Sequence, residues 1–227
     1  MPLRMHERRS PNHDARPPGA VVDMLVLHHT GMRTGAKALA RLCDPAARVS
    51  AHYLVEEDGA IFRLVPEERR AWHAGVSHWR GREALNATSI GIEIVNPGHE
   101  WGYRPFPALQ MGAVAELCLD ILARHPIPAR NVVGHSDIAP DRKRDPGEQF
   151  DWEGLARLGI GLWPEPATGP VAGDAREMLG RIGYRSDLPE ALLVTAFQRH
   201  WRPARVDGVA DAETRARIAG LLAAIGA

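Results

Sequence analysis

Short apolar runs that end in polar residues mark four places in the first 140 residues of the 227-residue chain. Runs of this length that are rich in Val, Leu and Ile are typical of buried strands, so each predicts a part of a sheet. They lie at 22–30, 51–66, 88–96 and 131–138. The second run is interrupted by Glu57-Asp58-Gly59, which is typical of a hairpin turn and therefore predicts two strands.

Between these runs, apolar residues recur with the period of an α-helix. The longest such stretch is 107–124, whose apolar residues lie three and four positions apart. The Ala- and Leu-rich segment 35–43 predicts a shorter helix that ends at Asp44-Pro45. Strands that alternate with helices indicate an α/β fold, with a central mixed β-sheet flanked by helices.

The character of the chain changes at 163–170, where three prolines are typical of a linker. Three helical stretches with short loops follow it, at 174–183, 188–200 and 211–225. A proline-rich start predicts an extended arm that either wraps the domain or frays. We therefore expect four parts: an arm at 1–20, an α/β domain at 21–163, a linker at 164–170 and a small three-helix domain at 171–227.

The charge balance argues against a nucleic-acid or anionic-lipid partner, because 28 Lys and Arg match 28 Asp and Glu. The two cysteines, Cys43 and Cys118, form no metal or disulfide pattern and predict half-buried apolar positions in helices. No run reaches the roughly 18 apolar residues that a membrane span needs. The first residues contain neither the apolar region of a signal peptide nor a lipobox cysteine. These features predict a cytoplasmic protein without membrane insertion, with the periplasm as the alternative.

Eleven histidines are many for this length and hint at metal or acid–base chemistry. His28 and His29 end one predicted strand, and because side chains alternate along a strand, only one of them can join a given site. His135 ends another strand and leads into a loop with several carboxylates. Two histidines and one carboxylate would supply the three protein ligands of a catalytic zinc site. The alternative for the loop is a solvated charged surface.

Two further features could carry chemistry. Glu93 lies within the isoleucine-rich strand SIGIEIVN, where burial would raise the pKa of its carboxyl and suit a general base, although an outward-facing position is the alternative. In the segment 68–83, Trp72, His73 and Trp79 lie among glycines and arginines. Such a loop can bind a sugar or a peptide, or it can be a structural loop held by one buried tryptophan.

Five segments in this order resemble one enzyme family: LHHTG, VSAHYLVEEDGAI, AWHAGVSHWRG, LNATSIGIEI and GHSDIAPDRKRDPG. They are similar to the zinc-dependent N-acetylmuramoyl-L-alanine amidases of the AmpD/AmiD type, which share the fold of the peptidoglycan recognition proteins. The resemblance covers about residues 20–163. It implies hydrolysis of the amide bond between N-acetylmuramic acid and L-alanine in peptidoglycan or muropeptides, by a monomer.

The resemblance also implies the site residues. One zinc ion per chain would be held by His28, His135 and Asp145. Glu93 would transfer the proton of the attacking water and Lys143 would stabilise the negative charge that develops on the carbonyl oxygen. The substrate groove would be lined by Trp72, His73 and Asn86. Alternatives to the amidase are a peptidoglycan sensor that binds without cleaving, and a zinc endopeptidase that cuts within the stem peptide.

The end of the chain, ALLVTAFQRHW followed by RVDGVADAETRARIAGLL, resembles the helical peptidoglycan-binding module that often follows such amidases. The alternative is a helical domain that only packs on the enzyme. A binding module favours polymeric wall as the substrate, whereas the absence of a signal peptide favours a soluble 1,6-anhydro-muropeptide. We expect the module to be dispensable for the chemistry, with the segment 163–170 acting as a spacer.

Overall fold

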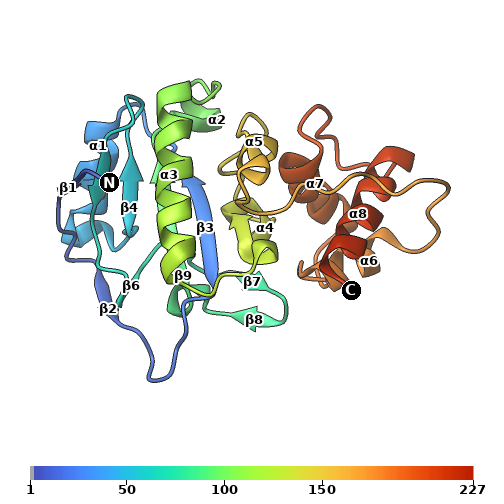
Figure 1. The fold of residues 1–227 in the computed structure, drawn as a ribbon, viewed down its shortest axis with the longest axis horizontal. Helices are drawn as coiled ribbons and strands as arrows, with labels where there is room; N and C mark the ends of the chain where they lie inside the picture. Colours follow the sequence, from blue (N-terminus) through green and yellow to red (C-terminus); the bar gives the residue numbers. More distant parts are fainter. Residues whose placement is uncertain (1–2, 227) are drawn as a thin grey trace.

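The computed structural model describes residues 3–226, whose centre is the predicted mixed sheet (Figure 1). Its six strands run in the order β1-β5-β4-β9-β3-β10. Their bounds are β1 Met5–Glu7, β3 Met24–His29, β4 Tyr53–Val55, β5 Ile61–Arg63, β9 Ser89–Ile94 and β10 Val132–Gly134. The hairpin β4-β5 is antiparallel, and the other neighbouring pairs are parallel. All four apolar runs therefore contain strands, as predicted.

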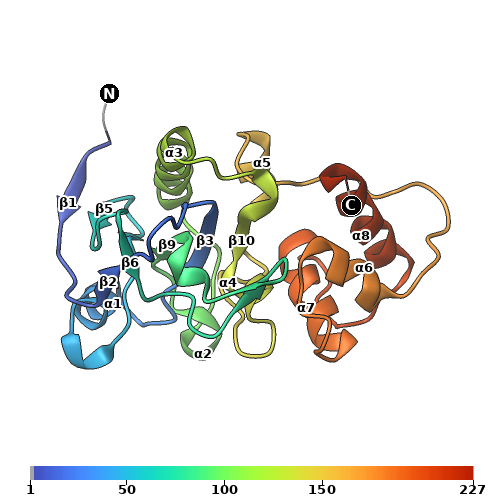
Figure 2. The ribbon, with the colours of Figure 1, turned by 90° about the horizontal axis from the view of Figure 1, so that it is seen from below.

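Helices cover both faces of the sheet (Figure 2). The longest, α3 (Ala108–Arg124), buries Leu117 and Ile121 against one face, where Leu25 and Ile92 belong to the same core. The opposite face carries α1 (Gly35–Leu42), which packs near Leu54. Short helices complete the domain: α2 Gly98–Trp101, α4 His135–Ile138 and α5 Trp152–Arg157.

The run 131–138 departs from the expected strand followed by a polar loop. Strand β10 ends at Gly134, and α4 begins at the next residue, His135. The carboxylate of Asp137 accepts a hydrogen bond from the backbone N–H of Gly134 over 2.7 Å, which satisfies a donor at the start of this helical turn. The position of His135 is therefore fixed both by the end of β10 and by the start of α4.

The N-terminal arm wraps the domain. Its first part, β1, pairs with β5, and β2 (His13–Ala15) pairs with β6 (Arg69–Ala71) in a separate ribbon. Arg16 then donates hydrogen bonds to the backbone carbonyls of Glu67, Asn86, Ala87 and Ser89. Because a guanidinium group carries five N–H donors in a fixed planar geometry, one arginine can form hydrogen bonds to several loops at the same time.

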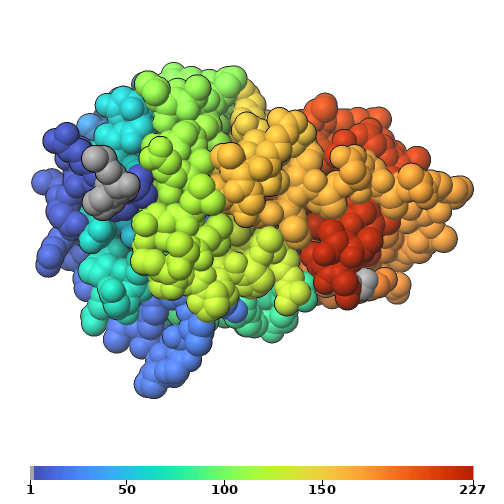
Figure 3. Space-filling model, in the orientation of Figure 1, coloured from blue at the N-terminus to red at the C-terminus, as the bar shows by residue number. Residues whose placement is uncertain are grey.

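The last part of the chain forms the three predicted helices, α6 Ala175–Ile182, α7 Glu190–Trp201 and α8 Ala212–Ile225. They pack directly against the sheet: Met24 and Val133 share one apolar core with Leu179 and Phe197. Figure 3 shows the atoms of this helical module adjoining those of the α/β domain. The segment 163–170 therefore connects two parts that share a core, and the backbone N–H of Ala167 donates to the carbonyl oxygen of Ala216 in α8.

None of the helices described between residues 3 and 226 has both the length and the apolar character required to cross a membrane.

Candidate metal centre and active site

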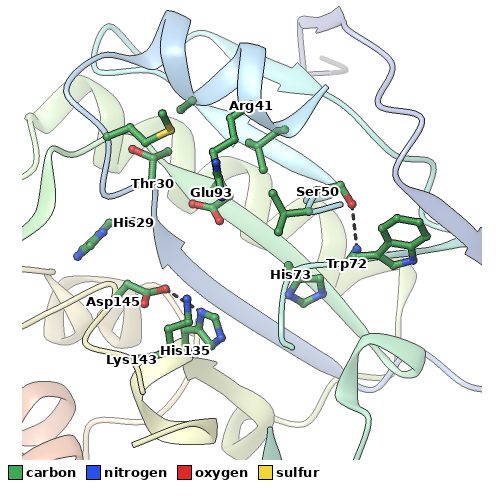
Figure 4. A pocket seen from close by; sticks show the side chains of 14 residues that line it. His29, Thr30, Arg41, Ser50, Trp72, His73, Glu93, His135, Lys143 and Asp145 are labelled. Carbon is green, nitrogen blue, oxygen red and sulfur yellow. Dashed lines mark hydrogen bonds and ion pairs between the residues drawn. The ribbon is translucent and has the colours of Figure 1, made fainter. Parts of the chain in front are cut away.

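Three side chains converge where β3 and β10 end. These strands are parallel neighbours with Leu27 opposite Gly134, so that His28 and His135 leave the sheet at the same edge. The Nδ1 atoms of the two histidines lie 2.9 Å apart. Oδ2 of Asp145 lies 3.1 Å from Nδ1 of His28 and 3.0 Å from Nδ1 of His135. All three residues are buried, and Figure 4 shows Asp145 and His135 pointing toward each other.

The chemistry of this donor set fits a divalent cation. Burial, followed by the charge of His135, lowers the pKa of His28 to about 4, so its imidazole is neutral near pH 7. Burial alone would raise the pKa of Asp145, but the two histidines outweigh it and hold that pKa well below its usual range. Two imidazoles and one carboxylate, packed together out of solvent, form a group that can ligate a metal ion.

The choice between the neighbouring histidines follows from strand alternation. His29 also borders the pocket but is not part of the three-residue cluster, and its ring centroid is 5.8 Å from that of His99 and 5.7 Å from that of Tyr103. Its two ring nitrogens have no hydrogen-bond partner among the described residues. Of the other loop carboxylates, Asp141 is exposed and Asp137 is buried away from the cluster.

Glu93 lies beside the cluster because it is the register partner of His28 on the parallel strand β9. Its Oε2 atom is shielded from solvent and has no hydrogen-bond partner among the described residues. Burial and the negative charge of Asp145 raise the pKa of the Glu93 carboxyl to about 8. A carboxyl with a pKa near neutrality, held without a partner, is suited to take and return a proton.

A pocket of about 190 Å³ opens over these groups (Figure 4). Glu93, His135, Lys143 and Asp145 line one part of it, and side chains of α1 and Trp72 line another. The Glu93 carboxyl, the Lys143 side chain and two of the three candidate metal ligands therefore face the same space. Such a combination could activate a water molecule for attack on a carbonyl and neutralise the charge that develops on the carbonyl oxygen.

The three residues predicted to bind substrate lie in different surroundings. Trp72 lines the pocket, and its backbone N–H donates to Oγ of Ser50 over 2.9 Å. His73 also borders the pocket but is buried, and its Nδ1 lies 3.1 Å from Nε2 of His28. Burial, followed by the neighbouring histidines, lowers the pKa of His73 well below its ordinary value. Oδ1 of Asn86 accepts hydrogen bonds from the backbone N–H groups of His73 and Ala74.

Sequence reasoning missed several residues that contact these groups. The hydroxyl of Ser89 is hydrogen-bonded to the ring of His73. The carboxylate of Asp137 accepts hydrogen bonds from Tyr184 and His200 of the helical module. Tyr184 and His200 lie 47 and 63 positions from Asp137 in the sequence. No local pattern connects residues so far apart. The one available signal was Asp137 itself, a carboxylate next to a buried strand end.

Comparisons with known proteins agree with the geometry. The family model described as N-acetylmuramoyl-L-alanine amidase matches residues 18–148. The N-acetylmuramoyl-L-alanine amidase AmiD of Escherichia coli is 40% identical, over 88% of this chain and 82% of AmiD. The 1,6-anhydro-N-acetylmuramyl-L-alanine amidase AmpD of the same organism is 39% identical, over 63% of this chain and 85% of AmpD.

Solved structures extend the likeness to the helical module. The structure of AmiD from E. coli superposes with a TM-score of 0.81 and 39% identity, covering 92% of this chain and 93% of that chain. AmpDh3 from Pseudomonas aeruginosa gives a TM-score of 0.83 at 38% identity, covering 93% and 95%. The resemblance read from the five sequence motifs is confirmed. The chain belongs to the N-acetylmuramoyl-L-alanine amidase family, and it is an amidase of the AmiD and AmpD type.

Proposed function

We propose that this amidase works with one zinc ion held by His28, His135 and Asp145, and that its substrates are anhydro-muropeptides. The convergence of three buried ligand atoms beside an unpartnered glutamate carries the proposal. Two histidines and one carboxylate are a typical ligand set of catalytic zinc. When bound there, zinc would lower the pKa of a water molecule and polarise the substrate carbonyl.

Glu93 is the proposed proton carrier. Its carboxylate accepts a proton from the attacking water and later gives that proton to the amide nitrogen of L-alanine, whose bond to the lactyl carbonyl carbon then breaks. Its elevated pKa places the two protonation states close in free energy near neutral pH, which suits both halves of this transfer.

Lys143 is the proposed charge stabiliser. It lines the same pocket as Glu93 and Asp145. Its ammonium would face the carbonyl oxygen, where negative charge develops only on the way to the tetrahedral state, and would stabilise that state over the bound substrate. The products are the sugar and a free peptide that begins with L-alanine.

The substrate class is inferred from relatives. AmiD from E. coli was solved with anhydro-N-acetylmuramic acid-L-Ala-D-gamma-Glu-L-Lys as its substrate, and AmpDh3 was solved with an anhydromuramic pentapeptide. Each covers more than nine-tenths of this chain. Trp72 lines the pocket and would pack on the bound muropeptide. We further propose that the enzyme acts as a monomer, with residues 21–163 as the catalytic domain.

A second proposed role belongs to residues 171–227. Their resemblance to a peptidoglycan-binding module supports capture of polymeric wall, while their shared core with the sheet supports a structural role as well. Sedimentation with insoluble peptidoglycan tests the first role. A Glu93→Gln protein serves for this assay, because its expected loss of activity would leave the polymer largely intact during the measurement.

The test of the main proposal is product analysis by mass spectrometry. The protein is incubated with anhydro-N-acetylmuramyl-tripeptide while its metal content is measured in parallel. An intact tripeptide that begins with L-alanine is expected, and it should disappear after chelation and return with added Zn²⁺. A shortened muropeptide would identify an endopeptidase, and binding without any product would identify a sensor. Full turnover in a protein stripped of metal would refute the role of zinc.

A further inference from the structure

The two histidines of the metal cluster both contact one short segment, His73-Ala74, through the ring nitrogen that faces away from the cluster. Nε2 of His28 lies 3.1 Å from Nδ1 of His73, and Nε2 of His135 lies 3.1 Å from the backbone carbonyl oxygen of Ala74. His73 and Ala74 are consecutive residues that follow β6. One dipeptide therefore contacts both candidate ligands on the side away from the cluster.

The hydrogen-bond chain beyond His73 determines where its proton lies. Oγ of Ser89 is 2.7 Å from the carbonyl oxygen of Leu85, which can only accept, so the single hydroxyl proton of Ser89 points there. Nε2 of His73 lies 3.1 Å from the same hydroxyl oxygen, which must therefore accept a hydrogen bond from Nε2. His73 thus carries its proton on Nε2 and leaves Nδ1 free as an acceptor.

The same reasoning extends to both ligands. Because Nδ1 of His73 accepts, His28 donates from Nε2, and its own Nδ1 presents a lone pair to the cluster. The carbonyl of Ala74 can only accept, so His135 also carries its proton on Nε2 and presents Nδ1 to the cluster. Both imidazoles are in the tautomer that can ligate a metal ion.

Two contacts hold the dipeptide itself in place. Oδ1 of Asn86 accepts from the backbone N–H of His73 over 3.1 Å and from that of Ala74 over 2.8 Å. The ring of His73 lies against β9 at Gly91, where an added Cβ would be only 2.4 Å from Cγ of His73. The absence of a side chain at Gly91 therefore makes room for the ring.

We propose that His73 and Asn86 are positioning residues of the metal centre, which act on His28 through the His73 ring and on His135 through the Ala74 carbonyl. This inference rests on the metal site proposed above and gives these two residues a role other than contact with substrate. A ligand histidine held in one tautomer and orientation does not have to be ordered when the ion binds. Loss of such a partner typically weakens metal binding about 10- to 100-fold.

The test measures Zn²⁺ affinity by competition with a chromophoric chelator in the full-length protein. His73→Phe keeps a ring of similar size without the acceptor, and Asn86→Ala removes the carbonyl oxygen that holds the dipeptide. Both should raise the Kd for Zn²⁺ by about 10- to 100-fold. The matched control is His6→Phe, since His6 is exposed and stacks on Phe62, remote from the cluster in the fold. Its Kd should equal that of the wild type.

A second set of variants separates positioning from folding. Asn86→Asp keeps an acceptor oxygen at the same place and should retain most of the affinity lost in Asn86→Ala. Ser89→Ala frees the proton of His73 to move to Nδ1 and should weaken Zn²⁺ binding while leaving Tm of the metal-bound form close to that of the wild type. The absorption spectrum of the Co²⁺-loaded protein should change in His73→Phe, because it reports ligand geometry directly.

The outcomes distinguish this inference from the proposed function. If the wild type itself binds no Zn²⁺, the metal site is refuted. If the wild type binds Zn²⁺ and both His73→Phe and Asn86→Ala bind it equally well but show a raised KM, the two residues contact substrate and the positioning role is refuted. The expected result is a raised Kd for Zn²⁺ with an unchanged KM at saturating Zn²⁺.

Discussion

The hydroxyl of Tyr184 donates a hydrogen bond to Oδ1 of Asp137 over 2.6 Å, joining the helical module to the turn that begins at His135. The second oxygen of Asp137 accepts from Nδ1 of His200 and from the backbone N–H of Gly134, each over 2.7 Å. This carboxylate is completely buried, and two of its three donors come from the helical module. The module therefore supports the segment that carries a proposed metal ligand.

Removal of the helical module should damage the metal centre. Although the sequence alone suggested that the module is dispensable for the chemistry, cutting the chain after Pro166 removes Tyr184 and His200, two of the three donors to Asp137, and uncovers the apolar face around Met24 and Val133. We expect a lower Tm and a weaker affinity for Zn²⁺, measured by calorimetry and chelator competition. Tyr184→Phe, which removes one hydroxyl, should cost about 1–3 kcal/mol of unfolding free energy. A truncated protein with the Tm and Zn²⁺ affinity of the full chain would contradict this view.

Replacement of Glu93 should separate catalysis from metal binding. Glu93→Gln keeps the shape of the side chain but cannot carry the proton. We expect kcat to fall about 10²- to 10⁴-fold with Zn²⁺ content unchanged, as is usual when a general acid–base group is lost. Steady-state kinetics and metal analysis on the same sample provide the check. Near-normal kcat would remove Glu93 from the mechanism.

The raised pKa of Glu93 predicts a pH-dependent effect on stability. In the folded metal-free protein this pKa is about 8, against an ordinary value of 4.5. Between these two values the unfolded chain releases the proton while the folded protein keeps it, so stability falls as the pH rises through this window. Glu93→Gln is always neutral and escapes this loss. Its Tm advantage over the wild type should be small at pH 5 and largest at about pH 8. An advantage that does not depend on pH would show that Glu93 titrates normally.

The two adjacent histidines should respond differently to the same substitution. His135→Ala leaves two of the three proposed ligands, so bound Zn²⁺ and activity should be lost together. His29→Ala should keep its Zn²⁺, because the ring of His29 lies near His99 and Tyr103 and is not part of the ligand cluster. Metal content after exhaustive dialysis measures both. Zn²⁺ retained by His135→Ala and lost by His29→Ala would reverse the assignment.

Lys143 should affect the reaction without affecting the metal. Lys143→Ala removes the positive charge from the pocket, and loss of one oxyanion-stabilising group typically costs about 10²- to 10³-fold in kcat. Lys143→Arg should recover part of that rate, because it restores a cation at the same place. Zn²⁺ content should match the wild type in both variants. A raised KM with unchanged kcat would place Lys143 in ground-state binding instead.

Apolar periodicity predicted the main helices and five of the six strands of the central sheet, but not β1, which lies in the arm where no apolar run marks it. The residues around the site were harder to predict. The sequence left His28 and His29 as alternatives on physical grounds, and only the parallel register of β3 and β10 places His28 beside His135. The linker expected at 163–170 stays a prediction: proline content describes the connection, whereas the apolar face of α7 determines where the helices dock.

The N-terminal arm affects how readily the edge of the sheet can pair with a strand of another molecule of this protein. A sheet edge with free N–H and C=O groups invites strands from other molecules. Here β1 occupies the free side of β5, and the outermost strand that results is only three residues long and carries His6 and Glu7. Such a short, polar edge strand provides few backbone groups with which a strand of a neighbouring molecule could pair. A variant without residues 1–9 would expose β5 instead, so the arm acts as a guard against edge-to-edge aggregation.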